Sequence, residues 1–148
     1  MIGSVTADGG EPRLPVVVLG TSTDAPGRVE IQAVVDTGFD GELQLPPDLV
    51  QRLGHPYEGS ARGTLADGSV SFFNYHTGRV LWHGAEREVV VVVSDAGPLV
   101  GMTLLNGNRL TVDAVPGGIV RIEEFLRTPL RGRGWRGPPL LPLALVRP

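Results

Sequence analysis

The chain has 148 residues, of which 21 are glycine, 13 are proline and 41% are hydrophobic, and its formal net charge is −3. This length fits a single domain, and glycine plus proline at about twice ordinary usage favours short strands and tight turns over a helical bundle. The lack of cysteine excludes disulfides, thiol nucleophiles and cysteine-bound metals, and the negative net charge argues against nucleic acid as a partner.

The sequence also argues against export and membrane insertion. Its first ten residues lack the basic start and the apolar segment of a signal peptide. No stretch approaches the roughly 18 consecutive apolar residues of a membrane-spanning helix. We therefore expect a cytoplasmic protein that has no membrane partner.

The N-terminal half predicts strands separated by turns. After a polar leader, Leu14–Gly20 is a short apolar run that ends in turn residues and indicates a strand. Arg28–Val35 alternates apolar and polar residues, as a strand with one buried face does. It continues into a glycine-containing loop, Asp36–Gly41, and Glu42–Leu45 follows as a further strand. Pro46–Leu53 then predicts a short helix, because proline is favoured in the first helical turn.

The C-terminal half predicts a hairpin and several more strands. Ala61–Ala66 and Ser69–Tyr75 flank Asp67-Gly68, a dipeptide typical of two-residue hairpin turns. The unbroken run Val89–Val93 implies a strand that is buried on both faces. The remaining expected elements are strands at Gly78–Trp82 and Glu88–Ser94, a short helix over Pro98–Asn106, and a closing hairpin of Arg109–Ala114 and Gly118–Glu123.

The tripeptide Asp36-Thr37-Gly38 is the strongest candidate for chemistry, because it places a carboxylate in a loop at the end of a hydrophobic strand. Alone, an Asp-Thr-Gly is equally consistent with an Asx-type turn. Its context is more specific. The apolar Ala33-Val34-Val35 precedes it, the Asp67-Gly68 hairpin follows later, and Leu99-Val100-Gly101 comes after that and leads into a short helix.

In this order and spacing, the motifs between Leu14 and Glu123 resemble those of the retropepsin-like aspartic proteases, the single-domain relatives of retroviral proteases. The resemblance implies an all-β fold for residues 1–124, a closed barrel with one or two short helices. It also implies a homodimer in which each subunit supplies one catalytic aspartate. The chain agrees with this, since it contains a single Asp-Thr-Gly and is too short for an internal duplicate.

The resemblance assigns a catalytic role to the tripeptide. Two Asp36 carboxylates within hydrogen-bond distance share one proton and titrate as a pair. The charged member can take a proton from water while the neutral member hydrogen-bonds to the scissile carbonyl of a peptide or protein substrate. Thr37 would brace the paired loops through its hydroxyl, and Gly38 would let the backbone approach the substrate.

Near the tripeptide, one residue of the chain matches the residue typical of the family and two differ from it. Asp40 matches a position at which retroviral enzymes contact the substrate main chain. Phe39 stands where better-known members have a small residue, and a bulky ring beside the carboxylates could either desolvate them or narrow the cleft. Met102 stands where retroviral enzymes have an arginine that supports this aspartate.

The hairpin around Leu65–Val70 is the candidate flap. A mobile hairpin over the cleft would exclude water and hold an extended peptide by main-chain hydrogen bonds; the alternative is an ordinary hairpin turn. The residues expected to bind substrate are Phe39, Asp40, Ala66, Asp67, Gly68, Ser69 and Val100. We expect no cofactor and no metal, because His55, His76 and His83 lack the spacing of metal ligands.

Residues 125–148 differ in composition from the rest of the chain and are interpreted as a tail or dimerisation arm. They hold five arginines and no acidic residue, which leaves all 16 acidic residues in residues 1–124. Arginines around Trp135 would suit nucleic acid, although a flexible, solvated segment also fits. The apolar Leu140–Val146 could interleave at a dimer interface, as retroviral protease termini do, or cover a strand edge.

The sequence therefore predicts a homodimeric aspartic endopeptidase that uses Asp36. The alternative is a retropepsin-like module that dimerises or binds peptides without turnover, because a fold does not fix a function.

Overall fold

The computed structural model describes residues 1–21, 27–65 and 67–125. Two of the sequence-based expectations, those for Ala66 and for the tail beyond Phe125, lie outside these residues. The helices are α1 (Pro47–Arg52) and α2 (Met102–Leu105). The strands are β1 (Ile2–Val5), β2 (Pro12–Leu19), β3 (Arg28–Val35), β4 (Leu43–Leu45), β5 (Tyr57–Thr64), β6 (Val70–Trp82), β7 (Ala85–Val93), β8 (Leu99–Val100), β9 (Asn108–Val112) and β10 (Ile119–Glu124).

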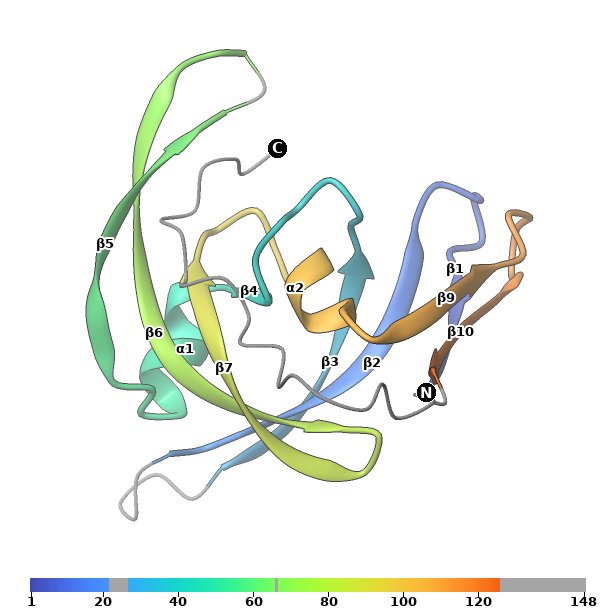
Figure 1. The fold of residues 1–148 in the computed structure, drawn as a ribbon, viewed down its shortest axis with the longest axis horizontal. Helices are drawn as coiled ribbons and strands as arrows, with labels where there is room; N and C mark the ends of the chain where they lie inside the picture. Colours follow the sequence, from blue (N-terminus) through green and yellow to red (C-terminus); the bar gives the residue numbers. More distant parts are fainter. Residues whose placement is uncertain (22–26, 66, 126–148) are drawn as a thin grey trace, which may run out of the picture.

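The strands form a single curved sheet (Figure 1). Its order is β5-β6-β7-β4-β8-β3-β2-β1-β10-β9, and a further pairing of β6 with β2 closes the middle of this order into a ring. The pairs β3–β8 and β4–β7 are parallel, and the others are antiparallel. The expected all-β fold is confirmed: the sheet is ring-like, and the described residues form two short helices, within the expected one or two.

Alternating side chains build the core inside this ring. On β2, Leu14, Val16 and Val18 have no exposed surface, whereas the residues between them are partly exposed. On β7, Val91 joins the main core while its neighbour Val92 joins a second, smaller cluster on the other face. The expected burial of β7 on both faces is therefore confirmed, and each such side chain contributes about 1.5–3 kcal/mol to stability.

Strand β6 is longer than the sequence predicts. The sequence predicts two strands, but β6 runs without a break from Val70 to Trp82. Gly78 lies within it, where an added Cβ would approach Val91 Cγ2 to 2.6 Å and the His55 ring to 3.0 Å. This glycine therefore permits close packing across the strand instead of ending it.

Strand β1 has no counterpart among the expected elements. The sequence predicts a polar leader before Leu14, but Ile2–Val5 pairs with β10 on one side and with β2 on the other. Strand β10 lies at the far end of the described chain from β1. Four residues are too few to show an alternation of apolar and polar side chains that would predict a strand. No helix in the described part of the chain is long and apolar enough to cross a membrane.

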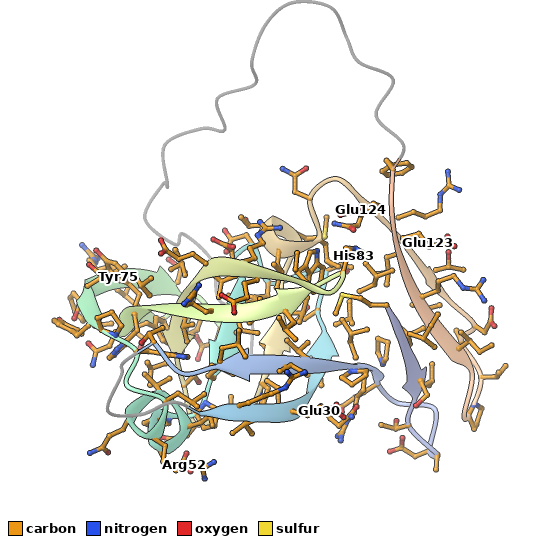
Figure 2. The ribbon with its side chains drawn as sticks, turned by 90° about the horizontal axis from the view of Figure 1, so that it is seen from below. Glu30, Arg52, Tyr75, His83, Glu123 and Glu124 are labelled. Atoms are coloured by element: carbon orange, nitrogen blue, oxygen red, sulfur yellow. The ribbon has the colours of Figure 1, made fainter. Side chains whose placement is uncertain are left out.

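The fold brings two sequence-distant segments to one side of the molecule. The β3–β4 loop and the tip of the β5–β6 hairpin both lie at the top of Figure 1, and the hairpin extends beyond the rest of the chain. A view from below shows Tyr75 of β6 at one end of the molecule and Glu123 and Glu124 of β10 toward the other (Figure 2). The hairpin thus lies away from β10, the last strand of the described chain (Figure 1 and Figure 2).

Candidate active site

Asp36 is the first residue after β3, and main-chain groups fix its position. Its N–H donates a hydrogen bond of 3.0 Å to the Val100 carbonyl. Its carboxylate Oδ1 accepts the Gly38 N–H at 2.8 Å, and its carbonyl accepts the Phe39 N–H at 3.2 Å. The half-buried carboxylate is therefore held in an Asx-type turn with a defined orientation.

Strand β8 and helix α2 clamp this loop from a distant part of the sequence. Strand β8 lies between β3 and β4, with Val100 opposite Val35 on one side and opposite Leu43 on the other. The chain after β8 then bonds back to the loop. These main-chain bonds are Gly101 N–H to Glu42 O (3.0 Å), Met102 N–H to Phe39 O (2.8 Å) and Thr103 N–H to Gly41 O (3.2 Å). The Thr103 hydroxyl adds a bond to the Asp40 carbonyl.

Gly101 makes this close approach possible. An added Cβ there would lie 2.2 Å from the Gly41 carbonyl oxygen and 2.6 Å from Phe39 Cδ1. The first contact is with backbone, which cannot turn aside as a flexible side chain can. The glycine of Leu99-Val100-Gly101 thus lets the loop and β8 pack together, and it determines where Asp36 lies.

The expected site residues of this loop divide into exposed and buried ones. Thr37 and Asp40 are exposed, and Asp36 is half-buried. The side chains of Phe39 and Val100 have no exposed surface. Both of these expected substrate-binding side chains therefore pack inside the protein in this structure. An apolar ring gains more by packing against other apolar groups than by lying beside water.

The tip of the β5–β6 hairpin is exposed, as a flap requires. Asp67, Gly68 and Ser69 all face solvent. The Leu65 N–H donates to the Ser69 carbonyl (2.8 Å), and the Gly68 N–H donates to the Leu65 carbonyl (2.9 Å). The connection is therefore one residue longer than the expected two-residue turn, and Gly68 supplies the left-handed conformation, with φ of 84°, that such three-residue hairpins need.

The carboxylate at the hairpin tip is also locally bonded. Asp67 Oδ1 accepts the Ser69 N–H at 2.8 Å, and hydrogen bonds from Ser69 lower the pKa of Asp67. This aspartate is fully exposed. We therefore infer that the Asp67 carboxylate stabilises the conformation of the turn.

Phe73 is a residue of the hairpin that the sequence did not single out. It lies on β6 opposite Ala61 of β5, and it packs against the buried pair Phe39 and Val92. Its neighbour Phe72 points to the other face and is 71% exposed. Period-two alternation would have suggested that the two rings lie on opposite faces, but only the fold reveals that the inward ring reaches the Asp36 loop.

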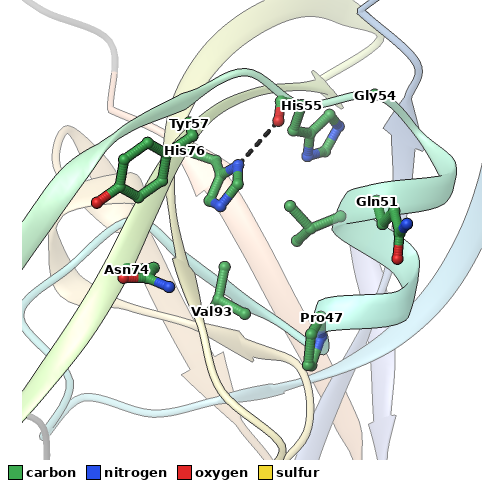
Figure 3. A pocket seen from close by; sticks show the side chains of 9 residues that line it. Pro47, Gln51, Gly54, His55, Tyr57, Asn74, His76 and Val93 are labelled. Carbon is green, nitrogen blue, oxygen red and sulfur yellow. Dashed lines mark hydrogen bonds between the residues drawn. The ribbon is translucent and has the colours of Figure 1, made fainter.

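A separate pocket of about 390 Å³ lies between α1 and the base of the hairpin (Figure 3). Its polar side chains are those of Gln51, His55, Tyr57, Asn74 and His76. The His76 Nδ1–H donates to the His55 carbonyl at 2.8 Å. Asn74 and His76 alternate with Phe73 along β6, so this pocket lies on the opposite face of the strand from the Phe39 contact.

His55 is buried beside this pocket. Its Nε2–H donates to the Leu19 carbonyl at 3.0 Å, whereas its buried Nδ1 has no hydrogen-bond partner. Burial is the main cause that lowers the pKa of His55. Within the described residues, no three His, Asp or Glu side chains lie close enough together to hold a metal ion.

Comparison with known proteins supports the fold. No protein-family model matches the sequence, and no curated protein sequence matches it either. The crystal structure of a retropepsin-like aspartic protease from Rickettsia conorii is similar, with a TM-score of 0.52 over 81% of this chain and 87% of that chain. The two sequences are 21% identical. The chain thus has a retropepsin-like fold, as its motifs indicate.

Proposed function

From this retropepsin-like fold, we propose that the protein is an aspartic endopeptidase that acts as a homodimer. The observation that carries the proposal is the half-buried Asp36 carboxylate, which a clamped loop holds on the same side of the molecule as an exposed hairpin. The sequence provides one Asp-Thr-Gly loop per chain. A second copy related by a two-fold axis would bring the second carboxylate to the same place.

In the proposed mechanism, the two Asp36 carboxylates share one proton. The charged carboxylate takes a proton from water, and the water oxygen bonds to the carbonyl carbon of the substrate. The neutral carboxyl group donates its hydrogen to the carbonyl oxygen. The carboxyl group that took the proton from water then gives it to the amide nitrogen, and the other carboxylate takes a proton back from a hydroxyl of the tetrahedral intermediate. The C–N bond breaks, which yields a new carboxyl end and a new amino end and restores the shared proton.

The surroundings of the loop favour a partner copy. Thr37 is exposed at the loop, where its hydroxyl is available to brace a partner loop. Met102 belongs to the clamp through its N–H, and its side chain is 47% exposed. An exposed apolar side chain beside the loop is stabilised when a second subunit covers it. The same surface patch of both subunits would then form the interface, as an isologous dimer requires.

The first test is Asp36→Asn, with Asp113→Asn as a matched control in an exposed turn. We expect Asp36→Asn to lower the rate of cleavage of a peptide library about 10²- to 10⁴-fold without changing the thermal unfolding temperature by more than a few degrees, and Asp113→Asn to cleave like the parent. Cleavage by Asp36→Asn at the parental rate would refute the proposal. Peptide binding without cleavage by the parent, retained in Asp36→Ala, would instead support a binding module.

Mixing the two forms tests the shared site. If both subunits contribute Asp36, a mixture of one part parent and three parts Asp36→Asn leaves about one-sixteenth of the dimers fully parental. Activity per total protein should then fall to about one-sixteenth, whereas independent subunits would retain about one-quarter. Sedimentation of the parent as a monomer at the assay concentration would also contradict the two-subunit site.

A further inference from the structure

The Asp36 loop and the hairpin share a small apolar cluster that is separate from the main core. We call Phe39, Phe73, Val92 and Leu99 the loop–flap cluster. Phe39 and Val92 have no exposed surface and form its centre, and Phe73 and Leu99 pack against them. The cluster thus joins four segments: the loop, β6 of the hairpin, β7 and β8.

Phe39 is bound to the clamp of the loop as well as to this cluster. Its N–H donates to the Asp36 carbonyl at 3.2 Å, and its carbonyl accepts the Met102 N–H at 2.8 Å. Its ring lies against Gly101, where a Cβ would be 2.6 Å from Cδ1. A shift of this ring therefore displaces both the Asp36 loop and the clamp at Gly101 and Met102, because interiors this closely packed transmit displacement.

The β5–β6 hairpin is packed against the cluster at Phe73, and the apolar side chains Val70 and Phe72 nearer its tip are exposed. Beyond the Ala61–Phe73 pair, the remaining pairs are Arg62–Phe72, Gly63–Ser71 and Thr64–Val70. Phe72 is 71% exposed, Val70 is 50% exposed, and nothing lies within 4 Å of a Cβ added at Gly68. Moving the outer part costs little apolar burial, whereas moving the hairpin at Phe73 exposes part of the cluster.

We propose that Phe39 is a positioning residue that holds β6 at Phe73, confines flap motion to the residues beyond this point, and couples that motion to the Asp36 loop. The flap role rests on the proposed function; the mechanical link between hairpin and loop does not. The bulky residue next to the tripeptide thereby acts through packing and not through contact with substrate.

Hydrogen exchange of the backbone amides tests this link without any substrate. Phe73→Ala removes the inward ring, and Phe72→Ala is the matched control, since it removes the same ring from the neighbouring position on the exposed face. In Phe73→Ala we expect exchange at the Phe39 and Met102 amides to accelerate about ten- to a hundredfold. The Ile122 amide, which bonds to the Met1 carbonyl, should exchange at the parental rate in both variants.

The outcomes separate the link from general instability. Phe72→Ala should leave the Phe39 and Met102 amides unchanged, and Phe73→Leu, which refills the space with an apolar side chain, should restore most of the protection. Acceleration restricted to β5 and β6 would overturn the proposal. Equal acceleration at Ile122 would also overturn it, because the effect would then be global.

A kinetic comparison connects the link to cleavage. With a peptide that the parent cleaves, Phe73→Ala should raise KM by about tenfold while kcat falls less, and the pH dependence should keep its shape, because the flap and not the carboxylate pair is changed. An unchanged KM in Phe73→Ala would show that the link between hairpin and loop does not affect catalysis. If the parent cleaves no peptide, the protease proposal fails, while the exchange experiment still decides the link.

Discussion

Two of the aspartate turns in the described residues, those at Asp36 and Asp67, have the same local geometry and different surroundings. In the β3–β4 loop, the Gly38 N–H bonds to Asp36 Oδ1 at 2.8 Å; at the hairpin tip, the Ser69 N–H bonds to Asp67 Oδ1 at 2.8 Å. The first turn is clamped by β8 and α2, and its aspartate is half-buried. The second is closed by bonds within its own hairpin, and its aspartate is exposed.

This contrast shows that an Asx turn orients a carboxylate but does not fix it in space. Fixing requires contacts from distant residues, such as those that Val100 and Met102 make to the Asp36 loop. A clamped carboxylate suits catalysis, because reacting groups must hold their geometry. A turn that depends only on its own hairpin suits a flap, because local opening costs little free energy.

The largest difference between the two turns is expected in activity. Asp36→Asn should lower kcat/KM about 10²- to 10⁴-fold, as the loss of a general acid–base group does. Asp67→Asn should lower it only a few-fold, because the amide oxygen can still accept the Ser69 N–H. Steady-state rates of both variants on one peptide give the comparison. Equal losses would show that the two carboxylates do not differ in role.

Glycine substitutions compare the clamp with the open tip in stability. Gly101→Ala forces a Cβ against the Gly41 carbonyl and the Phe39 ring, and it should lower the free energy of unfolding by about 3 kcal/mol. Gly68→Ala meets no neighbour but must adopt φ of 84°, which costs about 1–2 kcal/mol. Denaturant unfolding measures both values. A smaller loss in Gly101→Ala than in Gly68→Ala would mean that the clamp is not tight.

One side-chain hydrogen bond of the clamp can be removed alone. Thr103→Val keeps the branched shape but loses the hydroxyl that donates to the Asp40 carbonyl, so stability should fall by about 1 kcal/mol. Thr111→Val, at an exposed position of β9, controls for the same change of residue type and should have little effect. Equal losses of stability in the two variants would show that the effect comes from replacing threonine with valine in general, and not from the lost hydrogen bond of the clamp.

The sequence alone predicts what depends on neighbours along the chain. The alternation in Arg28–Val35 predicts β3 with its observed bounds, and the Asp-Thr-Gly predicts a carboxylate in a turn. It does not predict β1, which pairs with β10 at the far end of the described chain, or the burial of Phe39. The first depends on pairing with β10, and the second on closure of the ring, which brings β7 and β8 beside the loop. No local pattern encodes those contacts.

The smallest effect is expected at the base of the hairpin, which differs from the tip in being tied to the core. There the His76 Nδ1–H donates to the His55 carbonyl, and the Thr77 N–H donates to the Pro56 carbonyl at 3.0 Å. The His55 ring itself is buried, with Nε2 bonded to the Leu19 carbonyl and Nδ1 without a partner. A proton added at Nδ1 would be desolvated, so burial lowers the pKa of His55, and the nearby His76 lowers it further.

This shift gives stability a pH dependence of definite sign. Above the ordinary histidine pKa of 6.5, His55 is neutral in both the folded and the unfolded chain, and the shift costs nothing. As the pH falls below 6.5, the unfolded chain takes up the proton first, so the free energy of unfolding decreases until the lower folded pKa is passed. Denaturant unfolding of the parent and of His55→Gln at pH 8, 6.5 and 5 measures this slope. The parent should lose more stability than the variant between pH 6.5 and 5 and no more between pH 8 and 6.5, whereas parallel losses would show that His55 is not the group responsible.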